Sequence, residues 1–529
     1  MIMKKLITPL ILCLVIGSSA QTQIRYIDEV FGSFDLTSNI LYGTNLSVLG
    51  AAQGIPYIPT GVGTIPALVF DFYEPTGDVE AERPLIIFLH TGTFAPIIYN
   101  GNPTGMRQDF ATQRMCESFA KRGYTVANLE YRLGWNPTAP TQAERAASLM
   151  KAVFRAIQDV KGAVRYFRDD YENNTNSYRI DTSKIVLCGQ GSGGWIALAY
   201  ASIDKLQEIQ LPKFLDLTNP MNPIPLIDTA EIGDWNGYGG LYNLENYAGF
   251  SNDVHMVCTM GGGLGDLSWL EAGDVPVAAV HCPTDPVAVY TTGDVSIAQI
   301  GIITTDISGS HNVLKKANAL GNNNVLSNAY INDVYTTAAT NASMTAEGMT
   351  DYGGTVIGPI EKHLFPFLTQ NPFEASPWDF WDSTTVLYIT TQVLGLPAQQ
   401  GIAAHQSALA QNPNMSIAKS MAYIDSTLGF FCPRIAITTG LVASVGLDEN
   451  TSSGIELYPN PTSNTLTITA KDELIISINI YAMNGTEVYS LGEIDQNSIE
   501  LNNLNLNPGI YHCTVELNSQ QITKRIVIE

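Results

Sequence analysis

The chain has 529 residues, too many for a single compact core, so we expect one large domain and one small one. Apolar residues make up 45% of the chain and charged residues 15%, a composition typical of globular protein. The formal net charge of −23 would repel nucleic acid and anionic membrane surfaces, which argues against both as partners.

The first 20 residues have the pattern of a secretory signal peptide. Lys4 and Lys5 form a basic start, Leu6–Ile16 is an apolar run, and small residues up to Ala20 precede a cleavage site before Gln21. The apolar run is too short to span a bilayer, and no other stretch of about 18 apolar residues follows it. We therefore expect an exported protein without a transmembrane segment.

The cysteines predict neither a metal site nor a disulfide-built fold. Cys13 lies in the signal peptide, and the six others are widely spaced without a CxxC pair. We expect buried cysteines with at most one or two disulfides. The sequence also has no H-E-x-x-H, no P-loop and no G-x-G-x-x-G after a strand, so no metal or other cofactor is predicted.

From about Ala67, strand-like and helix-like segments alternate. Several of the strands are unbroken apolar runs, which predicts a mostly parallel sheet covered by helices on both faces. The expected elements are strands over 67–75, 84–92, 124–133, 184–189, 255–260 and 275–281, and helices over 114–123, over 144–169 and from about Gly193. Residues 211–252 are rich in Pro, Gly and Asn and predict an excursion over one face.

Further along the chain the pattern changes twice. Residues 290–440 mix short strands and helices, and we expect a cap or lid there. Short alternating runs after about residue 455 predict a small all-β sandwich of roughly seven strands. The predicted organisation is a signal peptide over 1–20, an α/β domain with its cap over 21–445, a linker over 446–454 and the β domain over 455–529.

The tail resembles the C-terminal sorting domain of proteins exported by the type IX (Por) secretion system of Bacteroidota. The matching residues are Leu457–Pro461, Leu466, Ile468, Tyr481, Asn484, Gly485, Leu504, Pro508–Tyr511 and the closing KRIVIE. The resemblance implies passage through the periplasm, recognition of the tail by the type IX machinery and removal of the tail, with the body released or held at the outer-membrane surface. The alternative is an unrelated sandwich that binds carbohydrate or protein.

The body resembles the carboxylesterase and hormone-sensitive-lipase-like branch of the α/β-hydrolases. The matching segments are VFDFYEPTGD, LIIFLHTGTF, RGYTVANLEYRLGW and AIQDVKGAVRYFRDD followed by YRIDTSKIVLCGQ. The resemblance implies that the turn at Gly92 and Thr93 directs backbone N–H groups at a developing oxyanion. Two glycines of the family's run are Thr91 and Thr93 here, which makes close backbone approach less assured.

The nucleophile elbow departs from its G-x-S-x-G pattern. An elbow needs small residues two before and two after the nucleophile, because the strand turns sharply into a helix. With Gly189 and Gly193 as these flanking residues, Gly191 and not a serine stands at the nucleophile position. Ser192 as nucleophile would put Gln190 in the crowded position, and a serine at a helix start is more often a cap.

The other triad residues have candidates but no unique assignment. Asp285, after a predicted strand, matches the family's catalytic aspartate, although an aspartate before proline is also a common turn residue. The histidine must follow it in the chain. His311 lies between a predicted strand and a helix, and His363 is the competitor.

Two functions follow from these residues. In the first, the protein is an exported carboxylic-ester hydrolase that uses Ser192, Asp285 and His311, with oxyanion donors near Gly92 and Gly193. In the second, the hydrolase fold has lost catalysis and binds a small molecule, glycan or partner at the cell surface. The position of Gly191 supports the second hypothesis.

Overall fold

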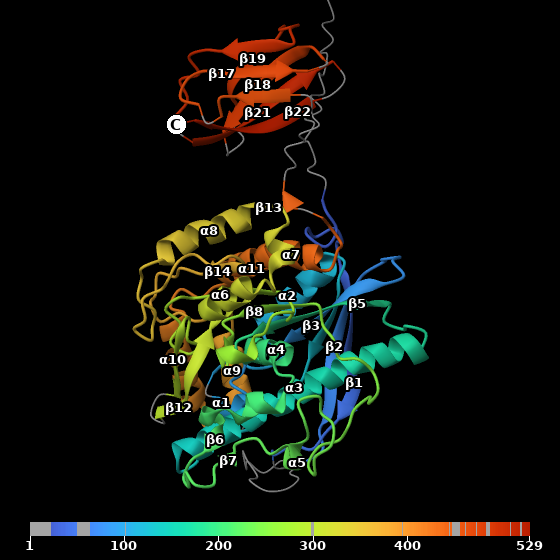
Figure 1. Ribbon diagram of the computed structural model, residues 1–529, viewed down its shortest axis with the longest axis vertical. Coiled ribbons are helices and arrows are strands. Elements are labelled where there is room, and N and C mark those ends of the chain that lie inside the picture. Colours follow the sequence, from blue (N-terminus) through green and yellow to red (C-terminus); the bar gives the residue numbers. More distant parts are fainter. Residues whose placement is uncertain are drawn as a thin grey trace, which may run out of the picture. The chain divides into compact units, whose positions relative to one another are not determined.

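The computed structural model of the protein describes residues 23–49, 64–100, 102–297, 301–393, 395–443, 445–446, 455–460, 462–471, 473–482, 487–507, 509–518 and 521–528. The chain forms two compact units, residues 1–444 and 445–529 (Figure 1). The predicted signal peptide and the predicted linker, apart from residue 446, lie outside the described residues.

The first unit is built on an eight-stranded sheet with the order β1-β2-β4-β3-β5-β8-β10-β14. β1 and β2 are antiparallel to their neighbours, and the pairs from β4 onward are parallel. The predicted parallel sheet is therefore confirmed. The strands are β1 (Phe34–Thr44), β2 (Ala67–Pro75), β3 (Arg83–Leu89), β4 (Thr125–Leu129), β5 (Ile180–Gln190), β8 (Met256–Met260), β10 (Val277–His281) and β14 (Leu364–Pro366).

Helices cover both faces of this sheet, as alternate residues of the buried strand β3 demonstrate. Leu85, Ile87 and Leu89 share one core with residues of α3 (Gln142–Asn173) and α4 (Ser192–Ser202). Because side chains alternate along a strand, Ile86 and Phe88 point to the other face. There α2 packs on β4 and α11 packs on α2. These helices span α2 (Phe110–Lys121) and α11 (Ile417–Thr438).

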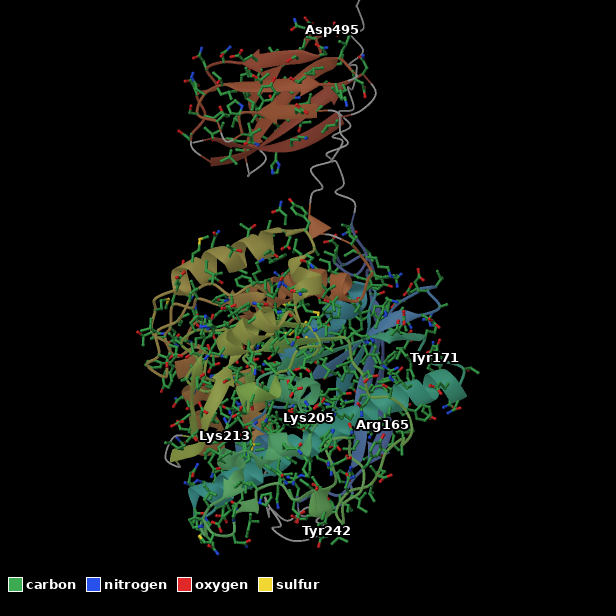
Figure 2. The ribbon with its side chains drawn as sticks, in the orientation of Figure 1. Arg165, Tyr171, Lys205, Lys213, Tyr242 and Asp495 are labelled. Carbon is green, nitrogen blue, oxygen red and sulfur yellow. The ribbon has the colours of Figure 1, made fainter. Side chains whose placement is uncertain are left out.

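The long helix α3 begins at a capping box. The side chain of Thr141 accepts from the Glu144 backbone N–H, and the Glu144 carboxylate accepts from the Thr141 N–H. Arg165, labelled on α3 in Figure 2, donates to the carbonyl oxygens of Asn236 (2.8 Å) and Asn246 (2.9 Å). These bonds hold the predicted excursion against the exposed side of α3.

The cap or lid expected over residues 290–440 does not extend over the whole of this segment. β14 completes the main sheet beside β10, and α11 packs on β8, β10 and α2, so both belong to the core. Helices α9 (Ser383–Tyr388) and α10 (Ala398–Gln411) pack on each other, and the segment around α10 covers the carboxyl ends of the strands. The sequence pattern missed β14 because a three-residue strand is too short for periodicity to reveal.

The remaining elements of the first unit lie outside the main sheet. They are α1 (Ile97–Asn100), η1 (Leu206–Gln210), η2 (Pro212–Phe214), β6 (Leu215–Asp216), β7 (Ile224–Pro225), α5 (Thr229–Ile232), β9 (Gly263–Leu264), η3 (Leu267–Trp269), β11 (Thr292–Ile297), β12 (Gly301–Gly309), α6 (Ser310–Leu320), α7 (Asn324–Ser327), β13 (Ile331–Asn332), α8 (Val334–Ala346) and η4 (Ile389–Val393). β11, β12 and β9 form a small separate sheet.

The second unit is all-β, as predicted. Two sheets, β16-β17-β20 and β19-β18-β21-β22, enclose a core in which Leu466, Ile478 and Ile526 are fully buried. Alternation of buried and half-buried residues along β17 explains the short alternating runs of the sequence. The strands are β15 (Val445–Gly446), β16 (Ile455–Tyr458), β17 (Leu466–Ala470), β18 (Ile475–Ala482), β19 (Glu487–Leu491), β20 (Ser498–Leu501), β21 (Gly509–Leu517) and β22 (Gln521–Ile528).

The six cysteines beyond the predicted signal peptide are all buried and unpaired. Within the described residues, no helix is long and apolar enough to cross a membrane.

Candidate active site

The turn from β5 into α4 is the sharpest feature at the carboxyl edge of the sheet. β5 ends at Gln190, Gly191 has φ 52° and ψ −118°, and α4 begins at Ser192. This backbone conformation is one that a residue with a side chain adopts only under strain. The Gly191 N–H donates to the Met260 carbonyl oxygen at 2.8 Å, which ties the turn to the neighbouring strand β8.

Two more glycines allow the turn to close. A Cβ on Gly189 would lie 2.3 Å from the Gly193 carbonyl carbon, and a Cβ on Gly193 would lie 2.1 Å from the Leu89 carbonyl oxygen. Both neighbours are backbone atoms of packed elements, so neither position accepts a side chain. The spacing of Gly189 and Gly193 puts Gly191 at the centre of the turn.

The space beside Gly191 is occupied by another residue. A Cβ built on Gly191 would lie 2.3 Å from the Thr91 side-chain oxygen and 3.2 Å from its Cβ. Thr91 follows β3 and stands where the hydrolase family has a glycine. The hydroxyl of Thr91 therefore fills the volume that a serine side chain at position 191 would need.

Ser192 has a different set of neighbours from a catalytic serine. Its Oγ lies 3.4 Å from the Tyr131 hydroxyl, which in turn donates to the His90 carbonyl oxygen at 2.8 Å. Ser192 is buried, is the first residue of α4 and borders the cavity described below. Among the described residues, no histidine nitrogen is hydrogen-bonded to Ser192.

Asp285 lies just beyond β10 and is buried. Its Oδ1 accepts from the backbone N–H groups of Val287 (2.7 Å) and Ala288 (2.8 Å), the geometry of a turn aspartate. Its Oδ2 lies 3.6 Å from Nε2 of His281. The histidine beside Asp285 is thus His281 at the end of β10, whose Nδ1 is 2.8 Å from the Ser310 hydroxyl.

The two candidate histidines lie elsewhere. His311 is buried at the start of α6, with Nε2 3.2 Å from the Pro359 carbonyl oxygen and Nδ1 3.2 Å from Oδ1 of Asn312. His363 precedes β14 and borders a second cavity. Ser192, Asp285 and His311 are not linked by hydrogen bonds among the described residues, and their joint catalytic role remains a prediction.

The turn after β3 has the strained backbone expected of an oxyanion loop. Gly92 has φ 131°, and Thr93 has φ 52°, an outlier for a β-branched residue. A Cβ on Gly92 would lie 3.0 Å from the Gly105 Cα, so this position needs glycine. The Thr93 carbonyl oxygen accepts from the Trp135 indole N–H at 2.8 Å, which holds the loop in this form.

These turns border a cavity of about 190 Å³, which we call the elbow cavity. Four of the chain's six tryptophans line it, namely Trp135, Trp195, Trp378 and Trp381, and Gly191, Ser192, Thr91 and Asp285 lie on its wall. The only charged groups among its described lining residues are the carboxyls of Asp285 and Asp379, and none of these residues is a histidine, lysine or arginine.

Asp379 is the residue of this cavity with the most perturbed ionisation. Burial, together with the negative charge of Asp109, raises the pKa of Asp379 to about 7. Its Oδ1 accepts from Nε2 of Gln190 at 2.8 Å. Burial also raises the pKa of Asp109 to about 6, although the N–H groups of Gly105 and Met106 donate to its carboxylate.

Two residues of this site have contacts that the sequence pattern does not reveal. The sequence shows Thr91 only as a departure from a glycine run, because its contact with Gly191 joins two distant segments. Asp379 lies in the segment expected to form a cap, and no sequence pattern singles it out. Within the described residues, no group of three or more His, Cys, Asp or Glu is placed to hold a metal ion.

Family comparisons agree with this architecture. Residues 70–222 match BD-FAE, a family of esterase-like hydrolases, and residues 456–529 match the secretion system C-terminal sorting domain. The body is an α/β-hydrolase-fold domain, defined by its strand order and by this match. The tail is a Por sorting domain, which marks the protein for secretion and attachment at the outer-membrane surface.

Solved structures with similarity to the chain are esterases of low sequence identity. Esterase 2 of Thermogutta terrifontis, phosphorylated by paraoxon, is 16% identical, with 49% of this chain and 74% of that chain covered and a TM-score of 0.28. A truncated carbohydrate esterase from gut microbiota is also 16% identical, with 54% and 84% covered and a TM-score of 0.30. A comparison with curated proteins found no match.

Proposed function

We propose that this exported hydrolase-fold protein binds a small molecule in the elbow cavity and does not cleave esters through a serine nucleophile. The observation behind the proposal is Gly191, which stands at the centre of the elbow with the Thr91 hydroxyl in the space of its missing side chain. Nucleophilic catalysis needs an activated nucleophile next to a base. The described residues of the cavity wall include no histidine to act as that base.

The lining of the elbow cavity favours a neutral or cationic ligand. Its charged groups are two carboxyls, which repel anions, and its four indole rings offer flat apolar surfaces. Asn102, Gln411, Asn412 and Ser376 add amide and hydroxyl groups that can orient a polar ligand. We propose a neutral ester or glycan unit as the ligand class.

The first test separates binding from serine chemistry. The purified chain is treated with a fluorophosphonate probe, beside the variants Ser192→Ala, Thr91→Ala and Ser376→Ala. We expect no covalent labelling of any of them. Labelling that Ser192→Ala or Thr91→Ala abolishes would overturn the proposal. Ser376→Ala is the matched control, since Ser376 lines the same cavity.

The second test measures binding directly. Neutral oligosaccharides and their acetate esters are titrated into the protein while tryptophan emission is recorded. We expect a saturable change that Trp378→Phe reduces and Trp235→Phe retains, because Trp378 lines the cavity and Trp235 does not. If no member of the panel changes the emission, this ligand class is wrong.

An ester hydrolase that uses Ser192 is the second candidate function. Two observations favour it: Ser192 and Asp285 border the same cavity, and residues 70–222 match an esterase-like family. Its weakness is the missing base, because the hydroxyl next to Ser192 Oγ belongs to Tyr131. Burial raises the pKa of Tyr131 above its usual range, so this phenol stays protonated and cannot accept the serine proton.

A further inference from the structure

A second cavity lies on the other side of the last sheet strand, and it shares no lining residue with the elbow cavity. Its volume is about 350 Å³, and we call it the Arg434 cavity. Residues of α7, α8, β14 and α11 line it, together with the loop before β14. Of its lining residues, His363 alone was a candidate from the sequence.

The defining group of this cavity is the guanidinium of Arg434 on α11, which is 2% exposed. Its Nη1 donates to the Phe430 carbonyl oxygen (2.8 Å) and to the Thr336 hydroxyl (3.2 Å), and the group lies 3.5 Å from the centroid of the Phe430 ring. Nε has no hydrogen-bond partner, and no partner of Nη2 is found in the described part of the chain. Nε is itself enclosed by the fold, so Nη2 is the guanidinium nitrogen left for a ligand in the cavity.

No carboxylate forms an ion pair with Arg434 among the described residues. The negative charge of Asp333, the N-cap of α8, acts on the Arg434 guanidinium from a distance. The Asp333 carboxylate itself accepts hydrogen bonds from the N–H groups of Tyr335 and Thr336 and from the Thr336 hydroxyl. Asp333 therefore reaches Arg434 only through the Thr336 hydroxyl. A buried cation without a direct partner is costly. Burial correspondingly lowers the pKa of Arg434 to about 9.

Other donors surround the same space. Lys362 borders the cavity and is exposed, and its ammonium has no carboxylate partner in the described part of the chain. The Nε2 atom of His363 lies 3.3 Å from the Ser327 hydroxyl oxygen, and its Nδ1 atom is buried without a hydrogen-bond partner. Glu361 is the one carboxylate among the described lining residues, and its Oε2 accepts from the Asn318 amide at 3.2 Å.

Apart from the hydroxyl residues Ser327, Thr336, Thr340 and Ser343, the rest of the described wall is apolar. The hydrophobic lining residues are Leu326, Ala329, Ile331, Ala339, Ile360, Leu364 and Phe430. Such a surface suits a hydrocarbon group and offers little to a compact, strongly hydrated ion such as phosphate. The ligand that fits must carry a negative charge at one end and an apolar body.

We propose that the Arg434 cavity binds a small organic carboxylate, with the carboxylate on Nη2 of Arg434 and the apolar body against Phe430 and Leu364. A guanidinium N–H forms a charge-assisted hydrogen bond with a carboxylate oxygen. The ligand supplies the counter-charge that Arg434 lacks. This site is independent of the elbow cavity and of the function proposed there.

The test measures carboxylate binding to the full chain in Tris chloride buffer. Butyrate and benzoate are the probes, inorganic phosphate is the comparison anion, and thermal unfolding and titration calorimetry are the readouts. We expect both carboxylates to raise the unfolding temperature, with phosphate at equal ionic strength giving no such shift. Arg434→Met should abolish binding, and Lys362→Gln should weaken it by about threefold, as for an exposed charge.

Controls keep the outcome decisive. Asp285→Asn alters the elbow cavity and should retain carboxylate binding unchanged. If Arg434→Met does not fold, Arg434→Lys replaces the fork with a point charge, and we expect about tenfold weaker binding. Absence of a carboxylate effect on the wild-type protein would overturn the proposal. So would binding that survives in both Arg434 variants, or a shift with phosphate and none with the carboxylates.

Discussion

The two cavities of the first unit lie in the same domain but have opposite electrostatic character. The elbow cavity has two carboxyls and four indole rings on its described wall, and no cationic side chain. The described wall of the Arg434 cavity has two cationic side chains, Arg434 and Lys362, and one carboxylate, Glu361. The elbow cavity is where the fold brings strand ends together, whereas helices α7, α8 and α11 enclose the other.

The two cavities show that the backbone turn typical of a hydrolase and the side chains able to bind a charged ligand can lie at different places in one domain. At the elbow, the backbone keeps the close approaches of a hydrolase turn, yet Gly191 and Thr91 leave it without a serine at the centre. The Arg434 cavity has no recognised sequence motif, but its buried guanidinium has no carboxylate partner among the described residues, and an anion would stabilise it. Backbone geometry and side-chain chemistry can therefore change independently.

The largest expected effect compares two buried arginines. Arg132 forms an ion pair with Asp159 at 2.9 Å, and both side chains have no exposed surface. Arg132→Met should lower the free energy of unfolding by about 3 to 5 kcal/mol, because it leaves a buried carboxylate unpaired. Arg434→Met, measured without carboxylates, should change it by less than about 1 kcal/mol. Urea unfolding of both variants tests this, and equal losses would mean that Arg434 is already neutralised.

The next effect concerns the wall of the elbow cavity. Gly193→Ala should lower the free energy of unfolding by about 3 kcal/mol or more. Its Cβ would overlap the Leu89 carbonyl group, which belongs to the backbone and cannot move aside. Gly32→Ala is the control, since no atom lies within 4 Å of that Cβ position. Gly191→Ala overlaps only the Thr91 side chain, and Thr91→Gly should partly rescue it. Equal unfolding midpoints for Gly193→Ala and Gly32→Ala would contradict the close approach.

A pH dependence distinguishes the acidic cavity further. The carboxyl of Asp379 has a pKa of about 7 in the folded chain, above its unfolded value. The folded state therefore keeps the proton to a higher pH than the unfolded state does, so the free energy of unfolding falls as pH rises from about 4 to 7. Asp379→Asn removes this loss and should be more stable than the wild type at pH 8, by on the order of 3 kcal/mol.

The measurement is urea unfolding of both proteins between about pH 4 and pH 8. Asp382→Asn is the matched control, because hydrogen bonds from Thr384 and Thr385 lower the pKa of the exposed Asp382 carboxyl. Its contribution has the opposite sign and is lost as pH falls. A constant difference between Asp379→Asn and the wild type over this range would show that Asp379 is ionised throughout.

The smallest expected effect concerns the backbone strain at Thr93, in the wall of the elbow cavity. Thr93 adopts φ 52°, which costs a β-branched residue energy that glycine avoids. Thr93→Gly should raise the free energy of unfolding by about 1 kcal/mol. Thr104→Gly, in the same cavity wall without a positive φ, should lower it. Destabilisation by Thr93→Gly would mean that side-chain packing outweighs the strain.

Much of the fold could be predicted from the sequence because its signals are local. Runs such as Leu85–Leu89 are apolar without alternation, as strands buried on both faces must be. The tail alternates, as in β17, because one face of each sheet meets the core. The short strand β14 could not be predicted, since Leu364–Pro366 pairs with β10 across more than 80 residues of chain.

The site was predictable only where a backbone requirement restricts residue type. The register of Gly189, Gly191 and Gly193 is visible in the sequence, because each lacks room for a side chain. Which histidine meets Asp285 was not visible: His281 is its neighbour, while His311 and His363 lie elsewhere. The pattern of neighbouring residues in the sequence does not reveal which distant loop packs beside the end of a given strand.

The sequence by itself determined the export tail, the parallel sheet and the position of Gly191, since each depends on residues close together along the chain. Only the tertiary structure decided that the Thr91 hydroxyl lies beside Gly191, that four tryptophans gather around it, and that Arg434 is left without a counter-ion. These features arise from contacts between distant segments. Their energies depend on burial and on the absence of competing partners, which no local pattern records.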